Sequence, residues 1–102
     1  MKTICLCCGY KTIDNRGDYD ICPVCFWEDE RYMVLLPEGK LTTVFDKVDC
    51  DDDKLVEIII DMESGANHGL TLREARANYL AFGACHKDML KHCRKPKKSE
   101  MV

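Results

Sequence analysis

Hydrophobic residues recur at helical spacing in the middle of the chain, directly after an acidic cluster at residues 51–53. The apolar positions that repeat at i, i+3, i+4 and i+7 are Leu55, Ile58, Ile59 and Met62. Because negative charges stabilise a helix N-terminus, this pattern predicts a helix over residues 53–63. A strand is the alternative, since β-branched residues are frequent here and the alternating residues Val56, Ile58 and Ile60 would share one face of a sheet.

A second helix is predicted to begin at Thr71, because its hydroxyl and the carboxylate of Glu74 have the spacing of a capping box. One face of this helix carries Leu72, Ala75, Tyr79 and Phe82. We therefore expect it to pack on the core and to be interrupted at Gly83. A shorter helical stripe follows and ends before Pro96; it consists of Met89, Leu90 and Cys93.

Residues 1–30 contain short polar and aromatic stretches separated by turn residues. Tyr10–Ile13 and Tyr19–Ile21 are predicted to form two short strands around the turn Asp14–Gly17. A hairpin of this size is too small to be stable unless its ends are clamped, and cysteines lie at those ends. Leu41–Phe45 predicts one further strand.

Eight cysteines in 102 residues are far more than a chain of this size usually contains. No signal peptide is recognisable at the N-terminus, and the longest aliphatic runs are too short to cross a bilayer. We therefore expect a cytoplasmic protein whose thiols stay reduced. Metal ligation is then favoured over a set of disulfides.

Two cysteine pairs have the spacing of metal ligands: Cys5 with Cys8, and Cys22 with Cys25. Two such turns can present four sulfurs to one tetrahedral ion, so we predict one structural Zn²⁺ held by these four residues. Cys7 stays open as an alternative to Cys8, and iron as an alternative to zinc. Because four thiolates leave no open coordination position, metal catalysis is not expected.

The charge balance bears on the class of partner. Fifteen Lys and Arg against eighteen Asp and Glu give a net charge of −3, which disfavours binding to a phosphate backbone. Basic residues are nevertheless concentrated in residues 86–98, and this cluster is either a contact surface or a solvated helix end and tail. No membrane partner is expected.

Three further residues are candidates for partner binding: Trp27, His68 and Arg73. Each has a structural alternative. Trp27 would pack over the metal-binding turn, His68 would lie in a loop at a helix entry, and Arg73 would be solvated. Cys50, Cys85 and Cys93 lie outside the two pairs, and we interpret them as small buried residues.

Three blocks of the sequence resemble the bacterial cysteine-rich CPCC family. They are Cys5–Tyr10, Tyr19–Asp29, and residues 65–85 with Gly65–His68, Leu72–Tyr79 and Phe82–Cys85. The chain has Leu6 where the family motif has proline, and residues 31–64 look like an elaboration. The resemblance implies a small zinc-binding bacterial protein and names no catalytic residue. An inhibitor or immunity-type role follows only by analogy.

The two cysteine turns also resemble rubredoxin knuckles, although Phe26 replaces the second glycine and the knuckles lie closer together in sequence. We therefore expect one α+β domain over residues 1–102, with a small zinc-ribbon-like β-hairpin lobe packed against two to three C-terminal helices. Its parts are the ribbon at 1–30, a strand and helix at 31–64, a helical part at 65–94 and a basic flexible tail at 95–102.

The function expected from the sequence is a non-enzymatic protein-interaction module that presents an acidic surface and the Trp27 region to a protein partner. A nucleic-acid-binding zinc ribbon is one alternative, and it rests on the basic cluster. A rubredoxin-like iron electron carrier or a thiol redox sensor is the other, and it would use Cys7, Cys50, Cys85 or Cys93. No Ser/His/Asp set, carboxylate pair or phosphate loop is recognisable, so an enzyme is not expected.

Overall fold

The first two strands form a short hairpin around the first cysteine pair. The structure, a computed structural model, describes residues 2–35, 37–43 and 51–102. Strand β1 (Thr3–Ile4) pairs antiparallel with β2 (Lys11–Ile13), with a bulge between Thr3 and Ile4. Cys5 and Cys8 therefore lie in the turn that joins the two strands.

The predicted pairing of Tyr10–Ile13 with Tyr19–Ile21 is wrong. Ile21 instead forms a bridge with Glu28, so that each cysteine pair closes a separate small hairpin. The reason lies in the intervening loop, whose backbone amides are satisfied by carboxylates. Asp20 accepts from the amides of residues 14 and 15 at 2.9 and 3.0 Å, and Asp29 accepts from Gly17 at 2.6 Å. These bonds stabilise a wide loop in place of a tight turn.

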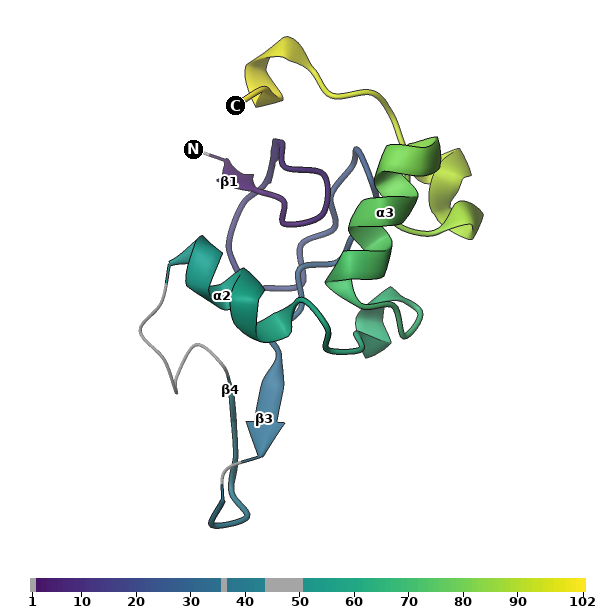
Figure 1. Ribbon diagram of the computed structural model, residues 1–102. Coiled ribbons are helices and arrows are strands. Elements are labelled where there is room, and N and C mark those ends of the chain that lie inside the picture. Colours follow the sequence, from purple (N-terminus) through teal and green to yellow (C-terminus); the bar gives the residue numbers. More distant parts are fainter. Residues whose placement is uncertain (1, 36, 44–50) are drawn as a thin grey trace.

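A second hairpin projects away from the rest of the molecule (Figure 1). Its strands are β3 (Met33–Leu35) and β4 (Leu41–Thr43), paired antiparallel in the register Met33↔Thr43 and Leu35↔Leu41. The strand predicted at Leu41–Phe45 is confirmed as far as Thr43. Its last two residues, like Cys50, lie outside the described residues.

Helix α2 (Asp52–Ile59) confirms the helical interpretation of its segment over the strand alternative. It begins one residue earlier than predicted, because the Asp51 carboxylate accepts a hydrogen bond from the Lys54 amide at 2.9 Å and caps the helix. Leu55 and Ile59 are its buried residues, one turn apart. The helix ends at Ile59 and not at residue 63, so Met62 lies in the following turn.

Helix α3 (Leu72–Phe82) has the predicted capping box, in which Thr71 and Glu74 each accept from the other's backbone amide. Gly83 ends the helix in the left-handed conformation at φ 91°, which glycine adopts without strain. Leu72 and Ala75 are fully buried, but Phe82 is 39% exposed and so departs from the predicted core face.

Short 3₁₀ helices complete the chain: η1 (Gly65–Asn67), η2 (Lys87–His92) and η3 (Lys98–Glu100). The predicted stripe before Pro96 is therefore a 3₁₀ helix. A flexible tail is predicted for residues 95–102, but the structure places η3 against β2. Glu100 there forms two 2.8 Å hydrogen bonds to the Arg94 guanidinium.

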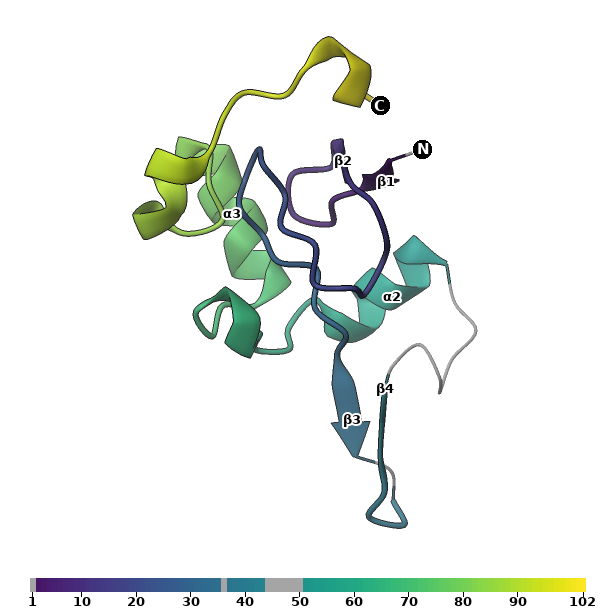
Figure 2. The same ribbon diagram turned by 180° about the vertical axis from the view of Figure 1, so that it is seen from behind.

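The core lies where the cysteine hairpins meet the helices. In both ribbon views, residues 2–30 lie between α2 on one side and α3 on the other (Figures 1 and 2). The buried cluster joins cysteines and apolar side chains from all three parts, including Cys22, Cys25, Trp27, Leu55, Ile59, Leu72 and Ala75. Among the described residues, no helix is both long and apolar enough to cross a membrane.

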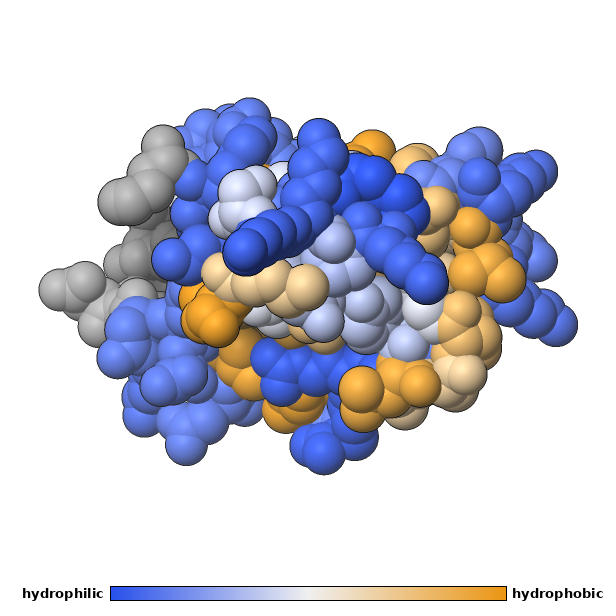
Figure 3. Space-filling model, turned by 90° about the horizontal axis from the view of Figure 1, so that it is seen from above, coloured by the Kyte–Doolittle hydropathy of each residue, from blue (hydrophilic) through white to orange (hydrophobic). Residues whose placement is uncertain are grey.

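From the end that carries both termini, most of the surface is hydrophilic (Figure 3). Hydrophobic residues are visible on the side of α3 and η2, at the right of that view, and also along its lower edge. The exposed large hydrophobic residues of these two helices are Leu80, Phe82 and Leu90.

Candidate metal centre

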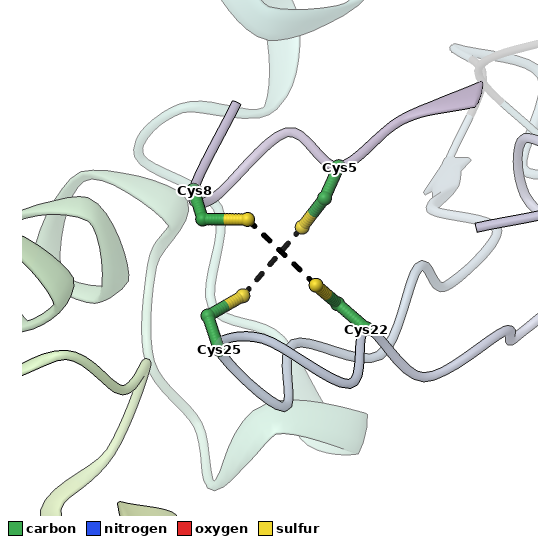
Figure 4. A group of neighbouring side chains, drawn as sticks. All are labelled: Cys5, Cys8, Cys22 and Cys25. Carbon is green, nitrogen blue, oxygen red and sulfur yellow. Dashed lines mark hydrogen bonds between the residues drawn. The ribbon is translucent and has the colours of Figure 1, made fainter. Parts of the chain in front are cut away.

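The turn between β1 and β2 shapes the first half of the centre. The Cys5 amide donates to the Tyr10 carbonyl at 2.8 Å, and the Gly9 amide donates back to the Cys5 carbonyl at 2.9 Å. Gly9 has φ 84°, a left-handed conformation that glycine reaches at no steric cost. This backbone geometry holds the Cys5 and Cys8 side chains on the same side of the turn (Figure 4).

The second cysteine turn repeats the first at the same offsets. The Cys22 amide donates to the Trp27 carbonyl at 2.9 Å, and the Phe26 amide donates to the Cys22 carbonyl at 2.8 Å. Phe26 occupies the position of Gly9 and also has a positive φ, 66°, which costs energy for a residue with a β-carbon. Its ring stacks on His92 with centroids 5.1 Å apart. The unfavourable backbone is therefore offset by packing that glycine would not provide.

The four predicted ligand sulfurs converge on one point (Figure 4). Cys5 and Cys25 sulfurs lie 3.6 Å apart, Cys8 and Cys22 sulfurs lie 3.7 Å apart, and all four lie within 4.8 Å of one another. A tetrahedral ion with sulfur ligands at about 2.3 Å requires sulfur–sulfur separations of about 3.8 Å. A disulfide would require about 2.05 Å. The quartet therefore fits a shared metal ion and not a pair of disulfides.

The protonation of the quartet favours a cation. The pKa of Cys22 is lowered, chiefly by hydrogen bonding with Cys25, and then with Cys5, Cys8 and Thr12. The pKa values of Cys5, Cys8 and Cys25 are raised, in each case first by the hydrogen bond with Cys22. Because these three pKa values are raised above that of a free thiol, Cys5, Cys8 and Cys25 keep their protons at neutral pH unless a cation binds them. A divalent cation that binds all four sulfurs as thiolates would displace those protons and compensate the accumulated negative charge.

The structure distinguishes between the two candidates in the first pair. Cys8, which is partly buried, belongs to the quartet, whereas Cys7, which is 7% exposed, does not. Cys85 is 1% exposed, and burial is the main reason that its pKa is raised to about 12. Cys93 is half-buried, donates to the Met89 carbonyl at 3.3 Å and also has a raised pKa because of burial. Both thiols are therefore protonated at neutral pH, which makes them poor nucleophiles.

The family of the chain follows from its sequence match. The family model described as cysteine-rich CPCC matches residues 3–43 and 49–100. The chain belongs to this family. No curated protein and no solved structure matches it. Because the match includes 31–43 and 49–64, most of the segment interpreted as an elaboration is part of the CPCC domain, which corrects that prediction.

The C-terminal part of this CPCC domain holds both cysteine turns through hydrogen bonds to the carbonyl groups of the turns. The Arg76 guanidinium donates to the Leu6 carbonyl at 2.8 Å, inside the first turn. In the second turn, the Cys25 carbonyl accepts from the Cys85 amide at 2.9 Å, and the Pro23 carbonyl accepts from the Arg94 amide at 3.2 Å. Sequence reasoning missed these contacts, because no local pattern marks a hydrogen bond to a distant carbonyl.

Arg16 and Asn67 are two further residues that the sequence analysis did not single out. The Arg16 guanidinium contacts the Asp29 carboxylate at 2.7 Å, the Asp52 carboxylate of α2 at 3.1 Å, and the Ile4 carbonyl. Asn67 is 2% exposed, and its amide group pairs with the backbone of Glu28 at 2.7 and 2.8 Å. Each side chain therefore joins the cysteine lobe to the second half of the chain.

The three candidate partner-binding residues lie in different surroundings. Trp27 is 1% exposed and packs in the core beside the cysteines, so its ring is not part of the surface. His68 is exposed and stacks on His86 with ring centroids 4.4 Å apart. Arg73 is exposed and pairs with Asp61 at 2.7 Å. The structure does not bring these residues together into one site.

Proposed function

We propose that this protein is a non-enzymatic zinc-binding module that uses a metal-stabilised fold to bind another protein. The observation that carries the proposal is the convergence of four cysteine sulfurs from two matching turns. A full set of four thiolates gives a closed tetrahedron, which is typical of structural zinc sites and leaves no position at which water can be activated.

Zinc is preferred to iron for this centre on chemical grounds. A tetrahedral thiolate site accepts either metal, but zinc requires no electron partner. The centre is also deeply placed, since Cys5, Cys22 and Cys25 are each at most 1% exposed. Such burial suits an ion that stabilises the fold.

A protein partner is favoured by the surface. The net charge of −3 opposes binding to a phosphate backbone, and acidic residues dominate α2 and its flanks. Exposed apolar side chains on α3 and η2 provide the kind of surface that protein interfaces bury. An inhibitor or immunity-type protein would act in this way, by occupying the surface of a partner.

Metal analysis of the purified full chain tests the first half of the proposal. We expect one zinc ion per chain and no visible iron–thiolate absorption. One iron per chain with reversible reduction would support the electron-carrier alternative and overturn the proposal. A redox sensor would instead lose zinc on treatment with hydrogen peroxide at concentrations that leave a Cys85→Ser, Cys93→Ser variant intact.

Affinity purification from cells with reversible crosslinking tests the second half. We expect a stoichiometric protein partner that is recovered with the zinc-loaded wild type and lost with a Cys22→Ser, Cys25→Ser variant. Tight DNA binding at physiological salt, without any stoichiometric protein, would contradict the proposal and favour the nucleic-acid alternative.

A further inference from the structure

An apolar groove with a volume of about 370 Å³ lies between the C-terminal end of α3 and the segment that follows η2. Its lining residues are Tyr79, Phe82, Gly83, Leu90 and Cys93, with Arg94, Lys95 and Pro96 at one side. We propose that this groove binds an acidic peptide segment of a protein partner, which inserts one bulky apolar side chain. This inference rests on the proposed protein-binding function and names the surface that performs it.

The floor of the groove is suited to an apolar anchor. Phe82 and Leu90 face it and are 39% and 47% exposed, although residues of these types are usually buried. Tyr79 also lines the groove, and its ring packs edge-on against Tyr10 with centroids 6.4 Å apart. A side chain inserted here would remove apolar surface of both partners from water, which is the main favourable contribution to most interfaces.

The rim of the groove carries positive charge that the protein itself does not neutralise. Arg94 is already paired through two hydrogen bonds with Glu100. Lys95 lines the groove, and Lys87 and Lys91 lie on η2, which contributes Leu90 to it. All three lysines are exposed and form no ion pair with any described residue. Carboxylates that flank the apolar anchor of a peptide would complement these ammonium groups and accelerate association.

The groove is positioned by the metal centre. Residues 93–96 form one side of the groove, and the hydrogen bond from the Arg94 amide to the Pro23 carbonyl fixes them to the Cys22–Cys25 turn. His92 stacks on Phe26, directly after the last ligand. Loss of the metal would release this turn, and residues 93–96 would move with it. Binding of the peptide is therefore expected to depend on zinc.

A nucleic acid is the less suitable occupant. It would place phosphates against the lysines, but Phe82 and Leu90 offer no hydrogen-bonding groups for base edges, and the Arg94 guanidinium is already paired with Glu100. The whole chain also has a net charge of −3, so approach of a long polyanion is opposed from the other faces. A short acidic segment meets only the local positive rim.

A peptide array read with the zinc-loaded full chain tests the proposal. The array carries peptides in which a central aromatic or aliphatic residue is flanked by glutamates and aspartates. Matched sets carry alanine at the centre, or lysines in the flanks. We expect binding to the acidic set with an apolar centre, and its loss when zinc is removed with a chelator.

Variants then locate the binding surface. Leu90→Ser and Lys95→Glu should each weaken binding of the selected peptide by about tenfold or more. Leu41→Ser and Lys40→Glu are the matched controls, because Leu41 is 61% exposed in β4 and Lys40 is exposed directly before it, both outside the groove and away from α3 and η2. These controls should bind as the wild type does. Because the exposed Lys95 ammonium forms no ion pair with a described residue, Lys95→Glu tests the groove even if Leu90→Ser disturbs η2.

The outcomes separate this inference from the proposed function. If acidic peptides bound the Leu90 and Lys95 variants as tightly as the wild type, the groove would not be the binding site. The proposed protein-binding function would be unaffected by that result. Selection of basic peptides, or tighter binding of a DNA duplex than of any peptide, would also overturn it. An array without binding, together with no partner from crosslinked cells, would reject the proposed function as well.

Discussion

The hydroxyl of Thr12 lies 2.9 Å from the sulfur of Cys22 and is 5% exposed. The two atoms are close enough for a hydrogen bond, and a Cys22 thiolate that ligates a metal can only accept, so the hydroxyl would then donate to it. Thr12 comes from β2, whereas Cys22 belongs to the second turn. The hydrogen bond therefore joins the two halves of the centre and stabilises the thiolate form that binds metal.

Replacing Thr12 by valine, which has nearly the same shape, should lower zinc affinity. Losses of partners next to metal ligands commonly cost about 10- to 100-fold in affinity, and we expect a value in that range. Competition with a chromophoric chelator measures it. Thr42→Val in β4 is the control and should leave affinity unchanged. Equal affinities for Thr12→Val and wild type would show that the hydroxyl does not support the thiolate.

Adjacent cysteines should respond differently to serine substitution. Cys8→Ser removes one sulfur of the quartet, so the purified protein should contain clearly less than one zinc per chain and should be less stable. Cys7→Ser leaves all four sulfurs in place and should keep one zinc per chain. Elemental analysis of the two variants decides the assignment. The reverse result would place Cys7 in the centre.

The centre was predictable from the sequence because its information is local. Two residues between paired cysteines fix how far apart their sulfurs can lie, so the two pairs are recognisable from their spacing, although spacing left Cys7 open as an alternative to Cys8 until the structure placed Cys8 in the quartet. The capping box at Thr71 and the glycine that ends α3 are local in the same sense. These features appear in the structure as the sequence predicts them.

Features that depend on distant parts of the chain were not predictable. The Arg76 guanidinium meets the Leu6 carbonyl across 70 positions, and nothing near either residue indicates the contact. The prediction of strand pairing was wrong for a related reason. The carboxylates of Asp20 and Asp29 accept hydrogen bonds from loop amides, and the short strands pair with other segments. Phe82 fits the helical period of the core face, yet it extends beyond the core because the helix ends at Gly83.

Removing the Arg16 guanidinium should destabilise the fold strongly. Asp29 is 3% exposed, and burial already raises its pKa, although the Gly17 amide and Arg16 lower it in part. Without Arg16 the carboxylate would remain buried with its charge uncompensated, so Arg16→Ala should lower the free energy of unfolding by about 3 kcal/mol or more. Urea unfolding of the zinc-loaded protein measures the change.

Arg73→Ala provides the matched control for Arg16. The Arg73–Asp61 pair has similar distances, but both side chains are about two-thirds exposed, so water screens the interaction. Its removal should leave the free energy of unfolding within experimental error. If the two alanine variants were equally stable, burial of the Arg16–Asp29 pair would not make it more important for folding stability than the exposed pair.

Removing the metal should unfold the helices together with the cysteine turns. The buried residues of α3, Leu72 and Ala75, belong to the same core cluster as Cys5, Cys22 and Cys25, so neither helix has a separate core on which to pack. Without the ion, four sulfurs within 4.8 Å of one another lose the charge that holds them together. We therefore expect a chelator to reduce helical circular dichroism and near-ultraviolet signals from Trp27 in one transition, and added zinc to restore both. Cys93→Ser, which leaves the quartet intact, should show the same response. A chelated protein that kept its helical signal would show that the core is stable without the metal centre.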